Sequence, residues 1–446
     1  MIKKILIANR GEIAIRIIRA AKELGIKTVA IYSKADKDSL HKKIADESVC
    51  IGEAPAKKSY LFYQNILGAA EASGSDAIHP GYGFLAENAD FADACKALNI
   101  TFIGPSPKSM RLMGDKATAR KLMTKAGVPV TPGSKGILKN ISTAKENAQQ
   151  IGYPIMIKAS AGGGGKGMRI VNQASELEKN LKNAAQESEK AFGSSELYLE
   201  KFVPNARHIE VQIIADQKGN TIHLFERECS IQRTHQKLLE ESPCPILSEE
   251  MRKKICGTAV TAAESVNYNS AGTVEFLYNV DSNKFYFMEM NTRIQVEHPV
   301  TEMITNIDLV KKQIDIASGE NLGLEQKDII HHGHAMECRI NAEDWKNNFR
   351  ASPGKITQYI PPGGFGVRVD SACYTGSYIL PYYDSMIAKL IAWGNTRNES
   401  ILRMKRALDE FIIDGIHTTI DFHKKILSHP EFIKSNITTN FIARYF

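Results

Sequence analysis

Closely spaced cysteines are absent from this 446-residue sequence. Its seven cysteines are scattered along the chain, are odd in number, and are nowhere arranged as a CxxC pair. This distribution argues against both a disulfide framework and a zinc site. We therefore expect a protein of a reducing, cytoplasmic compartment.

Long apolar runs are missing as well. The chain begins MIKKILIANRGEIAIRIIRA, and Asn9 and Arg10 interrupt its apolar run after about five residues, which is too short for a signal peptide. No stretch approaches the roughly eighteen consecutive apolar residues of a membrane-spanning helix. The sequence predicts a soluble protein.

A large excess of one charge is also lacking. The 57 basic and 50 acidic residues leave a formal net charge of +7, which suits anionic substrates but falls short of a nucleic-acid-binding protein. The hydrophobic fraction of 43% and the charged fraction of 24% are ordinary for globular proteins. A chain of this length is expected to form two or three domains.

The first hundred residues have the pattern of a parallel α/β sheet. Residues 4–9 read as a strand, 12–24 as a helix and KTVAIYS as a second strand, which together form a βαβ unit. The unit has no GxGxxG, so a dinucleotide site is not indicated. A Gly/Pro cluster near residues 104–107 marks the first boundary. Residues 153–203 then predict a small α+β subdomain, and the pattern becomes rich in strands beyond about residue 330.

Two acidic strands form the predicted hairpin GTVEFLYNV-DSNK-FYFMEMN. If Glu275 pairs with Glu289, two like charges face each other, which destabilises a sheet unless a cation lies between them. Their carboxylates, with Asn291 beside them, suit magnesium or manganese carrying the phosphates of a nucleotide. The alternative is an exposed hairpin with solvated acids.

A run of glycines at residues 162–165 is followed by Lys166 and Gly167. Glycines let backbone N–H groups approach phosphate oxygens closely. The run is not a Walker A loop, because Met168 and an apparent strand follow it. A glycine hairpin between two strands resembles the phosphate lid of ATP-grasp enzymes, and the alternative is a flexible surface turn. Lys116 and Lys158 flank this run and would pair with phosphate, although each taken alone is compatible with an ordinary surface lysine.

The segment ECSIQRTHQK concentrates hydrogen-bond donors directly after a predicted strand. Gln232, Arg233, His235 and Lys237 lie within six residues, a density that favours binding of a small anion. The alternative is a polar junction between strand and loop. His208, at the start of another strand, has a weaker case because a lone histidine there is usually structural.

Together these motifs resemble the biotin carboxylase subunit of biotin-dependent carboxylases, a branch of the ATP-grasp superfamily, over essentially the whole chain. The supporting strings include HPGYGFLAEN, KASAGGGGKGMR, MEMNTRIQVEHPVTE and PYYDSMIAKL. The resemblance implies a three-part α/β and α+β fold. Its parts would be a Rossmann-like N-terminal domain (1–110), an ATP-grasp domain (114–325) with a mobile lid subdomain (about 131–203), and a β-rich C-terminal domain (332–442).

The resemblance also implies a role for each motif residue. Glu297 would be the general base, with Lys237, Arg293 and Arg339 as its catalytic partners. Bicarbonate would be bound by Lys237, Arg293, Gln295, Val296 and Glu297, two magnesium or manganese ions by Glu275, Glu289 and Asn291, and biotin by Tyr82 and Arg339. ATP would be bound by Lys116, Lys158, Gly162, Gly163, Gly164, Gly165, Lys166, Gly167, Met168, Glu200, Lys201, Phe202, Val203, His208, Gln232, His235, Glu275, Leu277 and Glu289.

The implied reaction is ATP- and bicarbonate-dependent carboxylation of biotin through carboxyphosphate, with acetyl-CoA ahead of pyruvate or propionyl-CoA as the final acceptor. The rivals are another ATP-grasp ligase and a catalytically silent nucleotide-binding subunit. The sequence lacks the AMKM-like turn that accepts biotin. We therefore expect biotin on a separate carrier protein and a separate carboxyltransferase. On resemblance alone, we expect a homodimer through the region of Phe365 and Arg368.

Overall fold

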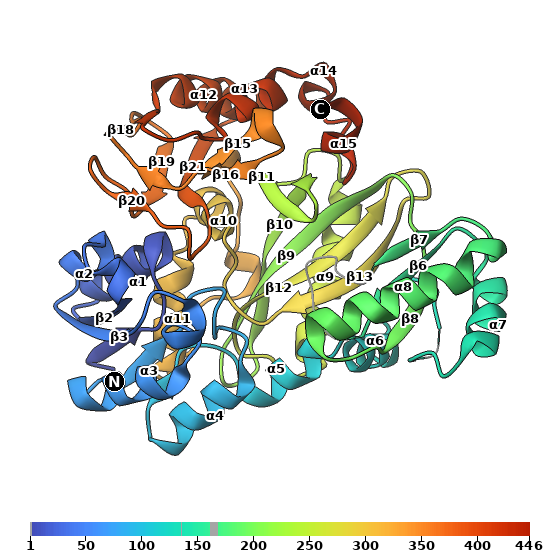
Figure 1. Cartoon of the computed structure of the whole chain (residues 1–446), viewed down its shortest axis with the longest axis horizontal. Helices are drawn as coiled ribbons and strands as arrows, with labels where there is room; N and C mark the ends of the chain where they lie inside the picture. The colour runs from blue at the N-terminus through green and yellow to red at the C-terminus, as the bar shows by residue number, and fades with distance from the viewer. Residues whose placement is uncertain (1, 135, 161–167) are drawn as a thin grey trace.

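The computed structural model describes residues 2–134, 136–160 and 168–446. Its N-terminal part is the predicted parallel sheet, in the strand order β3-β2-β1-β4-β5 (Figure 1). Helix α1 packs its apolar face against this sheet, as Ile13, Ile17 and Ala21 are buried. The elements are β1 (Lys4–Ile7), α1 (Gly11–Glu23), β2 (Lys27–Ser33), α2 (Leu40–Ile44), β3 (Glu47–Gly52), α3 (Tyr63–Ser73), β4 (Ala77–His79), α4 (Ala89–Ala97) and β5 (Thr101–Phe102).

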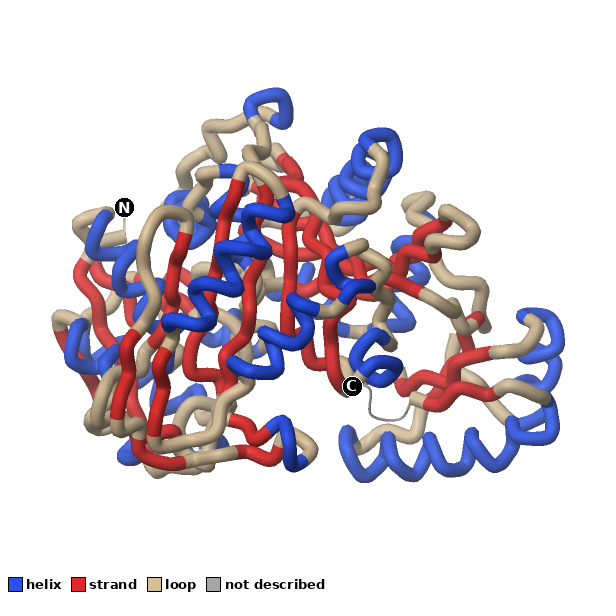
Figure 2. The backbone as a smooth tube through the Cα atoms, turned by 90° about the horizontal axis from the view of Figure 1, so that it is seen from above, coloured by secondary structure: helices blue, strands red, loops and turns tan. Residues whose placement is uncertain are grey.

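Two helices, α5 (Pro107–Gly114) and α6 (Lys116–Lys125), lead into a small antiparallel sheet. The sheet has the strand order β7-β6-β8, and it stands apart from the rest of the molecule with its helices along one side (Figures 1 and 2). This is the predicted α+β subdomain. Its elements are α7 (Ile141–Ile151), β6 (Ile155–Ala159), β7 (Arg169–Val171), α8 (Ala174–Phe192) and β8 (Leu197–Lys201). The predicted phosphate-binding residues Gly162, Gly163, Gly164, Gly165, Lys166 and Gly167 lie outside the described residues.

An eight-stranded antiparallel sheet occupies the centre of the molecule (Figure 1), in the order β13-β12-β9-β10-β11-β14-β21-β19. Its strands come from chain segments on both sides of residue 330, which are joined where β11 pairs with β14. The strands are β9 (Ala206–Ala215), β10 (Thr221–Arg233), β11 (Gln236–Ser242), β12 (Ser270–Asn279), β13 (Lys284–Asn291), β14 (His334–Asn341), β19 (Val367–Ser371) and β21 (Met386–Gly394). The helices that follow β11 and β13 are α9 (Glu249–Glu264), α10 (His298–Thr305) and α11 (Leu309–Ala317).

The last third of the chain covers the β14, β21 and β19 end of this sheet. Helix α12 packs on β21 and β14, and its Met404 and Leu408 enter a core that also holds Cys338 and Leu390. The helices are α12 (Arg397–Glu410), α13 (Ile420–Ser428), α14 (Pro430–Ile433) and α15 (Phe441–Tyr445), and the short strands are β15 (Glu343–Asp344), β16 (Arg350–Ala351), β17 (Gly354–Lys355), β18 (Gln358–Ile360), β20 (Tyr378–Ile379) and β22 (Ile412–Asp414).

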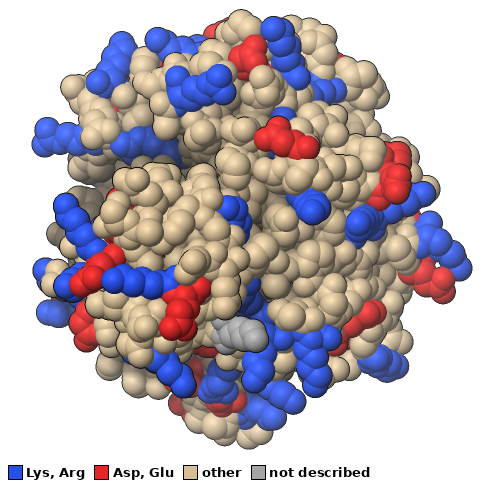
Figure 3. Space-filling model, turned by 90° about the vertical axis from the view of Figure 1, so that its right-hand side faces the viewer, with Lys and Arg blue, Asp and Glu red and all other residues tan. Residues whose placement is uncertain are grey.

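The surface shows no field of one sign on the face seen in Figure 3, where basic and acidic side chains are interspersed. This mixture agrees with the small formal net charge of +7. Among the described helices, none combines the length and the apolar character that crossing a bilayer requires.

Candidate active site

A cavity of about 780 Å³ lies where the N-terminal sheet, the small subdomain and the central sheet meet. It gathers side chains that are far apart in the sequence, from Tyr82 after β4 to Arg339 on β14. The sequence-predicted site residues that line it are Tyr82, Lys116, Lys158, Met168, His208, Gln232, His235, Lys237, Glu275, Glu289, Asn291, Arg293, Gln295, Val296 and Arg339.

Some predicted residues lie outside this lining. Glu297 is fully buried directly behind Lys237, with 2.7 Å between the Lys237 Nζ and a Glu297 carboxylate oxygen. Leu277 lies on β12 opposite His208 of β9. The predicted ATP-binding segment at residues 200–203 connects the small subdomain to β9. Within the described part of the chain, the predicted residues that do not line the cavity are Glu200, Lys201, Phe202, Val203, Leu277 and Glu297.

The acidic hairpin has the predicted pairing, because Glu275 of β12 lies directly opposite Glu289 of β13. Asn291 donates a hydrogen bond of 2.8 Å to Glu275, and the Lys116 Nζ lies 3.5 Å from Glu289. Two facing carboxylates with a side-chain amide beside them fit a hard divalent cation. Among the described residues, two groups of three side chains are spaced closely enough to share one ion. One is His208, Glu210 and Glu275, and the other is Glu210, Cys229 and Glu297, so neither includes Glu289. The metal role of Glu289 therefore stays a prediction.

Lys237 is the centre of the buried charges. Its ammonium group contacts the carboxylates of Glu210, Glu275 and Glu297, the last two at 2.9 and 2.7 Å. Burial alone would lower the pKa of Lys237, but the three carboxylates outweigh burial and raise that pKa well above its ordinary value. Lys237 therefore keeps its positive charge at neutral pH, as a residue that binds an anion must.

Glu297 precedes helix α10 and is held between two cations. Besides Lys237, the guanidinium of Arg339 lies 3.0 Å from its other oxygen. Burial works to raise the pKa of Glu297, but Lys237 and Arg339 outweigh it and hold that pKa well below its usual range. Glu297 is therefore ionised and able to accept a proton.

Arg339 is positioned by a carboxylate that the sequence did not single out. Its Nε donates to Glu240 at 2.7 Å, and its Nη2 lies 2.6 Å from the same oxygen. Burial raises the pKa of Glu240 to about 7, because the nearby charge of Glu297 adds to burial while Arg339 opposes it. The carboxylate fixes the guanidinium plane of Arg339 at the edge of the cavity.

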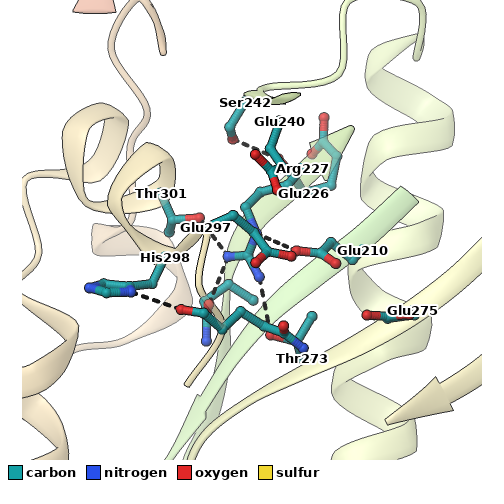
Figure 4. A network of polar contacts seen from close by, with 12 residues as sticks. Glu210, Glu226, Arg227, Glu240, Ser242, Thr273, Glu275, Glu297, His298 and Thr301 are labelled. Carbon is teal, nitrogen blue, oxygen red and sulfur yellow. Dashed lines mark hydrogen bonds and ion pairs between the residues drawn. The ribbon is translucent and has the colours of Figure 1, made fainter. Parts of the chain in front are cut away.

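A fully buried arginine, Arg227, holds one of the carboxylates that contact Lys237. Figure 4 shows Arg227 between Glu210, Thr273 and Thr301. Its Nε donates to Glu210 at 2.6 Å, and its two Nη atoms donate to Thr301 at 2.9 Å and Thr273 at 3.1 Å. Because its donors reach partners on three elements, Arg227 fixes Glu210, which in turn contacts Lys237. A signal for Glu210 existed in HIEVQIIAD, where His208 and Glu210 alternate on one side of a strand.

Three of the predicted ATP-binding residues that line the cavity are Lys116, Lys158 and His208. Lys158 is the penultimate residue of β6, and the partner predicted for its ammonium group is a nucleotide phosphate. The structure shows a protein partner as well, because the Lys158 Nζ lies 2.6 Å from Glu200. Burial works to raise the pKa of Glu200, but Lys158 and Arg120 outweigh burial and lower it.

One donor of the segment at residues 232–237 points away from the cavity. Arg233 donates to Asn348 at 2.7 Å, and its guanidinium lies 4.3 Å from the centre of the Phe349 ring. The prediction that Arg233 joins the anion-binding donors is therefore wrong. Arg233 is the last residue of β10, and the chain turns back at Thr234 and His235, both with positive φ. This turn brings Gln232, His235 and Lys237 to the cavity without Arg233.

The predicted biotin side is built on the N-terminal domain. The hydroxyl group of Tyr82 donates to Glu12 of α1. Burial, with the charge of Glu12, raises the pKa of Tyr82 well above its ordinary value. Lys389 of β21, which is fully buried, lies 3.1 Å from Glu12. Glu12, which lines the cavity, and the buried Lys389 beside it were not predicted from the sequence.

Three family models match the chain in succession. They are "Biotin carboxylase, N-terminal domain" over residues 1–110, "Carbamoyl-phosphate synthase L chain, ATP binding domain" over residues 115–325, and "Biotin carboxylase C-terminal domain" over residues 337–444. Among curated proteins, the chain is 58% identical to Biotin carboxylase 1 of Bacillus subtilis, over 100% of this chain and 99% of the relative.

Solved structures agree with these matches. A biotin carboxylase from Campylobacter jejuni in complex with β,γ-ATP has a TM-score of 0.97 and 52% identity, and the match covers 100% of this chain and 99% of that chain. The biotin carboxylase domain dimer of Hydrogenobacter thermophilus 2-oxoglutarate carboxylase, with MgADP, ADP and bicarbonate, has a TM-score of 0.96 and 51% identity. That match covers 100% of this chain and 98% of the other.

Proposed function

This chain belongs to the biotin carboxylase family, and we propose that it carboxylates biotin with ATP and bicarbonate. The observation that carries the proposal is the buried contact of Lys237 and Arg339 with Glu297 at the wall of the cavity. An ionised carboxylate between two cations can take a proton from a bound anion while the cations hold the charge that remains.

Bicarbonate would enter between Lys237, Arg293 and the loop of Gln295 and Val296, all of which line the cavity. The bound anion would interact with the same ammonium group of Lys237 as Glu297 does. Lys237 would then stabilise the ionised Glu297 less, so that Glu297 becomes a stronger base. Glu297 would then take the proton of bicarbonate. The released oxygen lone pair would attack the γ-phosphorus of ATP, giving carboxyphosphate and ADP.

ATP would be oriented by Lys116, Lys158 and His208. Glu275, Glu289 and Asn291 would hold magnesium or manganese, in keeping with the facing carboxylates of the hairpin. When bound, such an ion offsets the negative charge of the phosphates. The MgADP and bicarbonate named for the Hydrogenobacter structure support this choice of ligands.

Biotin would approach from the side of Tyr82 and Arg339. Arg339, held by Glu240, would place a positive charge beside the biotin ring, where negative charge develops when a proton leaves its nitrogen. We propose that the biotin is attached to a separate carrier protein and that separate carboxyltransferase subunits use the product.

We also propose a final acceptor, an assembly and a location. Acetyl-CoA remains the first choice, with pyruvate or propionyl-CoA as alternatives, and the likeness to a domain of a 2-oxoglutarate carboxylase adds a further keto acid. A homodimer is supported by the dimer named for that same structure. Seven free cysteines support a reducing cytoplasmic compartment.

The decisive test is ATP cleavage by the purified chain with bicarbonate and free biotin varied separately. We expect cleavage that depends on bicarbonate and rises when biotin is added, together with the appearance of carboxybiotin. ATP cleavage at a rate that does not depend on biotin would instead favour another ATP-grasp ligase. No cleavage at all would favour a catalytically silent nucleotide-binding subunit.

A further inference from the structure

The loop between β13 and α10 has three consecutive carbonyl groups, each held by a basic side chain. Two of these side chains come from the loop and the start of α10, and the third comes from β21. The three hydrogen bonds are Arg293 Nη1 to Ile294 O at 3.3 Å, His298 Nδ1 to Gln295 O at 2.8 Å, and Lys389 Nζ to Val296 O at 3.0 Å.

These bonds determine where the N–H groups of the loop point. In a trans peptide unit, the C=O of one residue and the N–H of the next point in opposite directions. Holding the three carbonyls therefore aims the N–H groups of Gln295, Val296 and Glu297 away from the basic side chains. None of these three N–H groups donates a hydrogen bond to any of the described residues. Successive free N–H groups next to a lysine form an anion site.

Lys389 is an unusual residue for such a structural contact. It is fully buried, and it does not line the cavity, so it does not reach an anion bound there. Its ammonium group lies 3.1 Å from Glu12 and 3.9 Å from Asp370. A buried ammonium group is costly unless it is fully paired, and leucine or methionine would fill the same space without that cost. Packing alone therefore does not account for a lysine at this position.

The position of Lys389 in the sheet connects three parts of the molecule. It pairs with Arg339 of β14 on one side and with Asp370 of β19 on the other. Its ion pair with Glu12 connects it to helix α1, and the carboxylate of Glu12 also accepts a hydrogen bond from Tyr82. One ammonium group thus connects the N-terminal domain, the C-terminal end of the sheet and the Val296 carbonyl.

We propose that His298 and Lys389 are positioning residues for bicarbonate, which hold the carbonyl groups of Gln295 and Val296 so that the N–H groups of Val296 and Glu297 face the anion. The inference rests on the proposed function, because it takes bicarbonate as the anion. Neither side chain touches a substrate, and both act through the loop backbone. His298 is buried, and its bond to a carbonyl oxygen requires the proton on Nδ1.

The test is a comparison of two Michaelis constants in the full chain. In Lys389→Met, the KM for bicarbonate at saturating ATP should rise about tenfold, which corresponds to one hydrogen bond from a charged donor. The KM for ATP at saturating bicarbonate should stay within about twofold, because Lys116 and Lys158 are untouched. Lys355→Met, an exposed residue of β17, is the matched control and should change neither constant.

Two further variants separate positioning from folding. In the double variant Lys389→Met/Glu12→Gln, no carboxylate of this ion pair is left uncompensated, so the fold should be kept and the raised KM for bicarbonate should persist. His298→Phe keeps a flat ring but removes the donor, and it should raise the KM for bicarbonate about fivefold, as expected for a neutral hydrogen bond.

Hydrogen exchange supplies a readout besides activity. Peptides covering residues 292–300 should exchange faster in Lys389→Met than in the wild type, while peptides of β9 and β12 should not. An unchanged KM for bicarbonate in both Lys389→Met and the double variant would overturn the inference, as would an equal rise in the KM for bicarbonate and the KM for ATP. A wild-type protein without bicarbonate-dependent ATP cleavage would instead refute the proposed function.

Discussion

Lys237 illustrates how single residues share the work of this site. Its ammonium group contacts Glu210, Glu275 and Glu297, which belong to three different segments of the chain. The resemblance carried by MEMNTRIQVEHPVTE implied site roles for Glu289, Asn291, Arg293, Gln295 and Glu297, and the structure places four of these five at the cavity with Glu297 behind Lys237. That inference was possible because one short run carries all five.

Other residues of the site could not be predicted from local patterns. Lys389 lies 93 residues from the Val296 carbonyl that it holds, and Glu240 lies 99 residues from Arg339. Their partners are set by the pairing of β11, β14 and β21, which only the folded sheet reveals. A buried charged residue inside an apolar strand, such as the lysine of MIAKLIAWG, is the one local sign that was present.

At this scale, Glu297→Gln tests the proposed base. The amide keeps the shape and one of the two oxygens that accept from Lys237 and Arg339, but it cannot accept the proton of bicarbonate. Bicarbonate-dependent ATP cleavage should fall at least about 100-fold, while ATP binding measured by calorimetry should be unchanged. The control Glu53→Gln, at an exposed carboxylate of the N-terminal domain, should leave cleavage unchanged. Retained cleavage in Glu297→Gln would show that another group is the base.

At the scale of elements, the hairpin of β12 and β13 was predicted from alternation and from the DSNK turn. Its pairing of Glu275 with Glu289 is confirmed, but the shift of register directly after Glu275 was not predicted. Such a shift comes from an extra residue in one strand, which alternation does not indicate when both faces are buried. The subdomain of residues 153–203 was also predicted, because its strands and helix follow one another within a short span.

Strand β11 and helix α12 are joined by an ion pair that titrates at low pH. Glu241 is fully buried, and Arg397 and His334 contact it at 2.6 and 2.8 Å. Burial works to raise the pKa of Glu241, but Arg397 and His334 outweigh it and lower that pKa from 4.5 to about 2. A carboxyl whose pKa is lower in the folded chain stabilises the fold above its unfolded pKa and loses that stabilisation as the pH falls.

We therefore expect Glu241→Gln to reduce the free energy of unfolding by up to about 3 kcal/mol at pH 7. The difference from the wild type should shrink as the pH falls from about 4.5 towards about 2, because the wild-type carboxyl becomes protonated in that window. Urea unfolding at several pH values measures this. A difference that stays constant from pH 7 to pH 3 would contradict the assigned role of the ion pair.

At the scale of the whole molecule, the proposed dimer involves an exposed aromatic residue. Phe365 has 77% of its surface exposed and lies against Arg403 and Trp393. Nearby Arg368 forms ion pairs with Asp370 and with Glu302 of α10. Large exposed aromatic side chains are common at the centre of protein interfaces.

Phe365→Glu should shift the chain towards a monomer in sedimentation velocity at micromolar concentration, because a charge at the centre of an interface loses its hydration. Phe62→Glu, at another exposed phenylalanine with 43% of its surface accessible, should not change the sedimentation coefficient. A monomeric wild-type protein would refute the proposed dimer, and a Phe365→Glu variant that remains dimeric would place its contact elsewhere.

The strand pairing of β11 with β14 has a consequence for recombination between relatives. Family models place a boundary between residues 325 and 337, where a crossover would look harmless. Yet the central sheet continues across that boundary, and Glu240 of one segment lies beside Glu337 of the other. In a chimera joined there, β11 of one parent would have to pair with β14 of the other, and the buried charged residues between the two strands would come from different parents. Shuffled genes should therefore survive better when the exchanged block contains both β11 and β14.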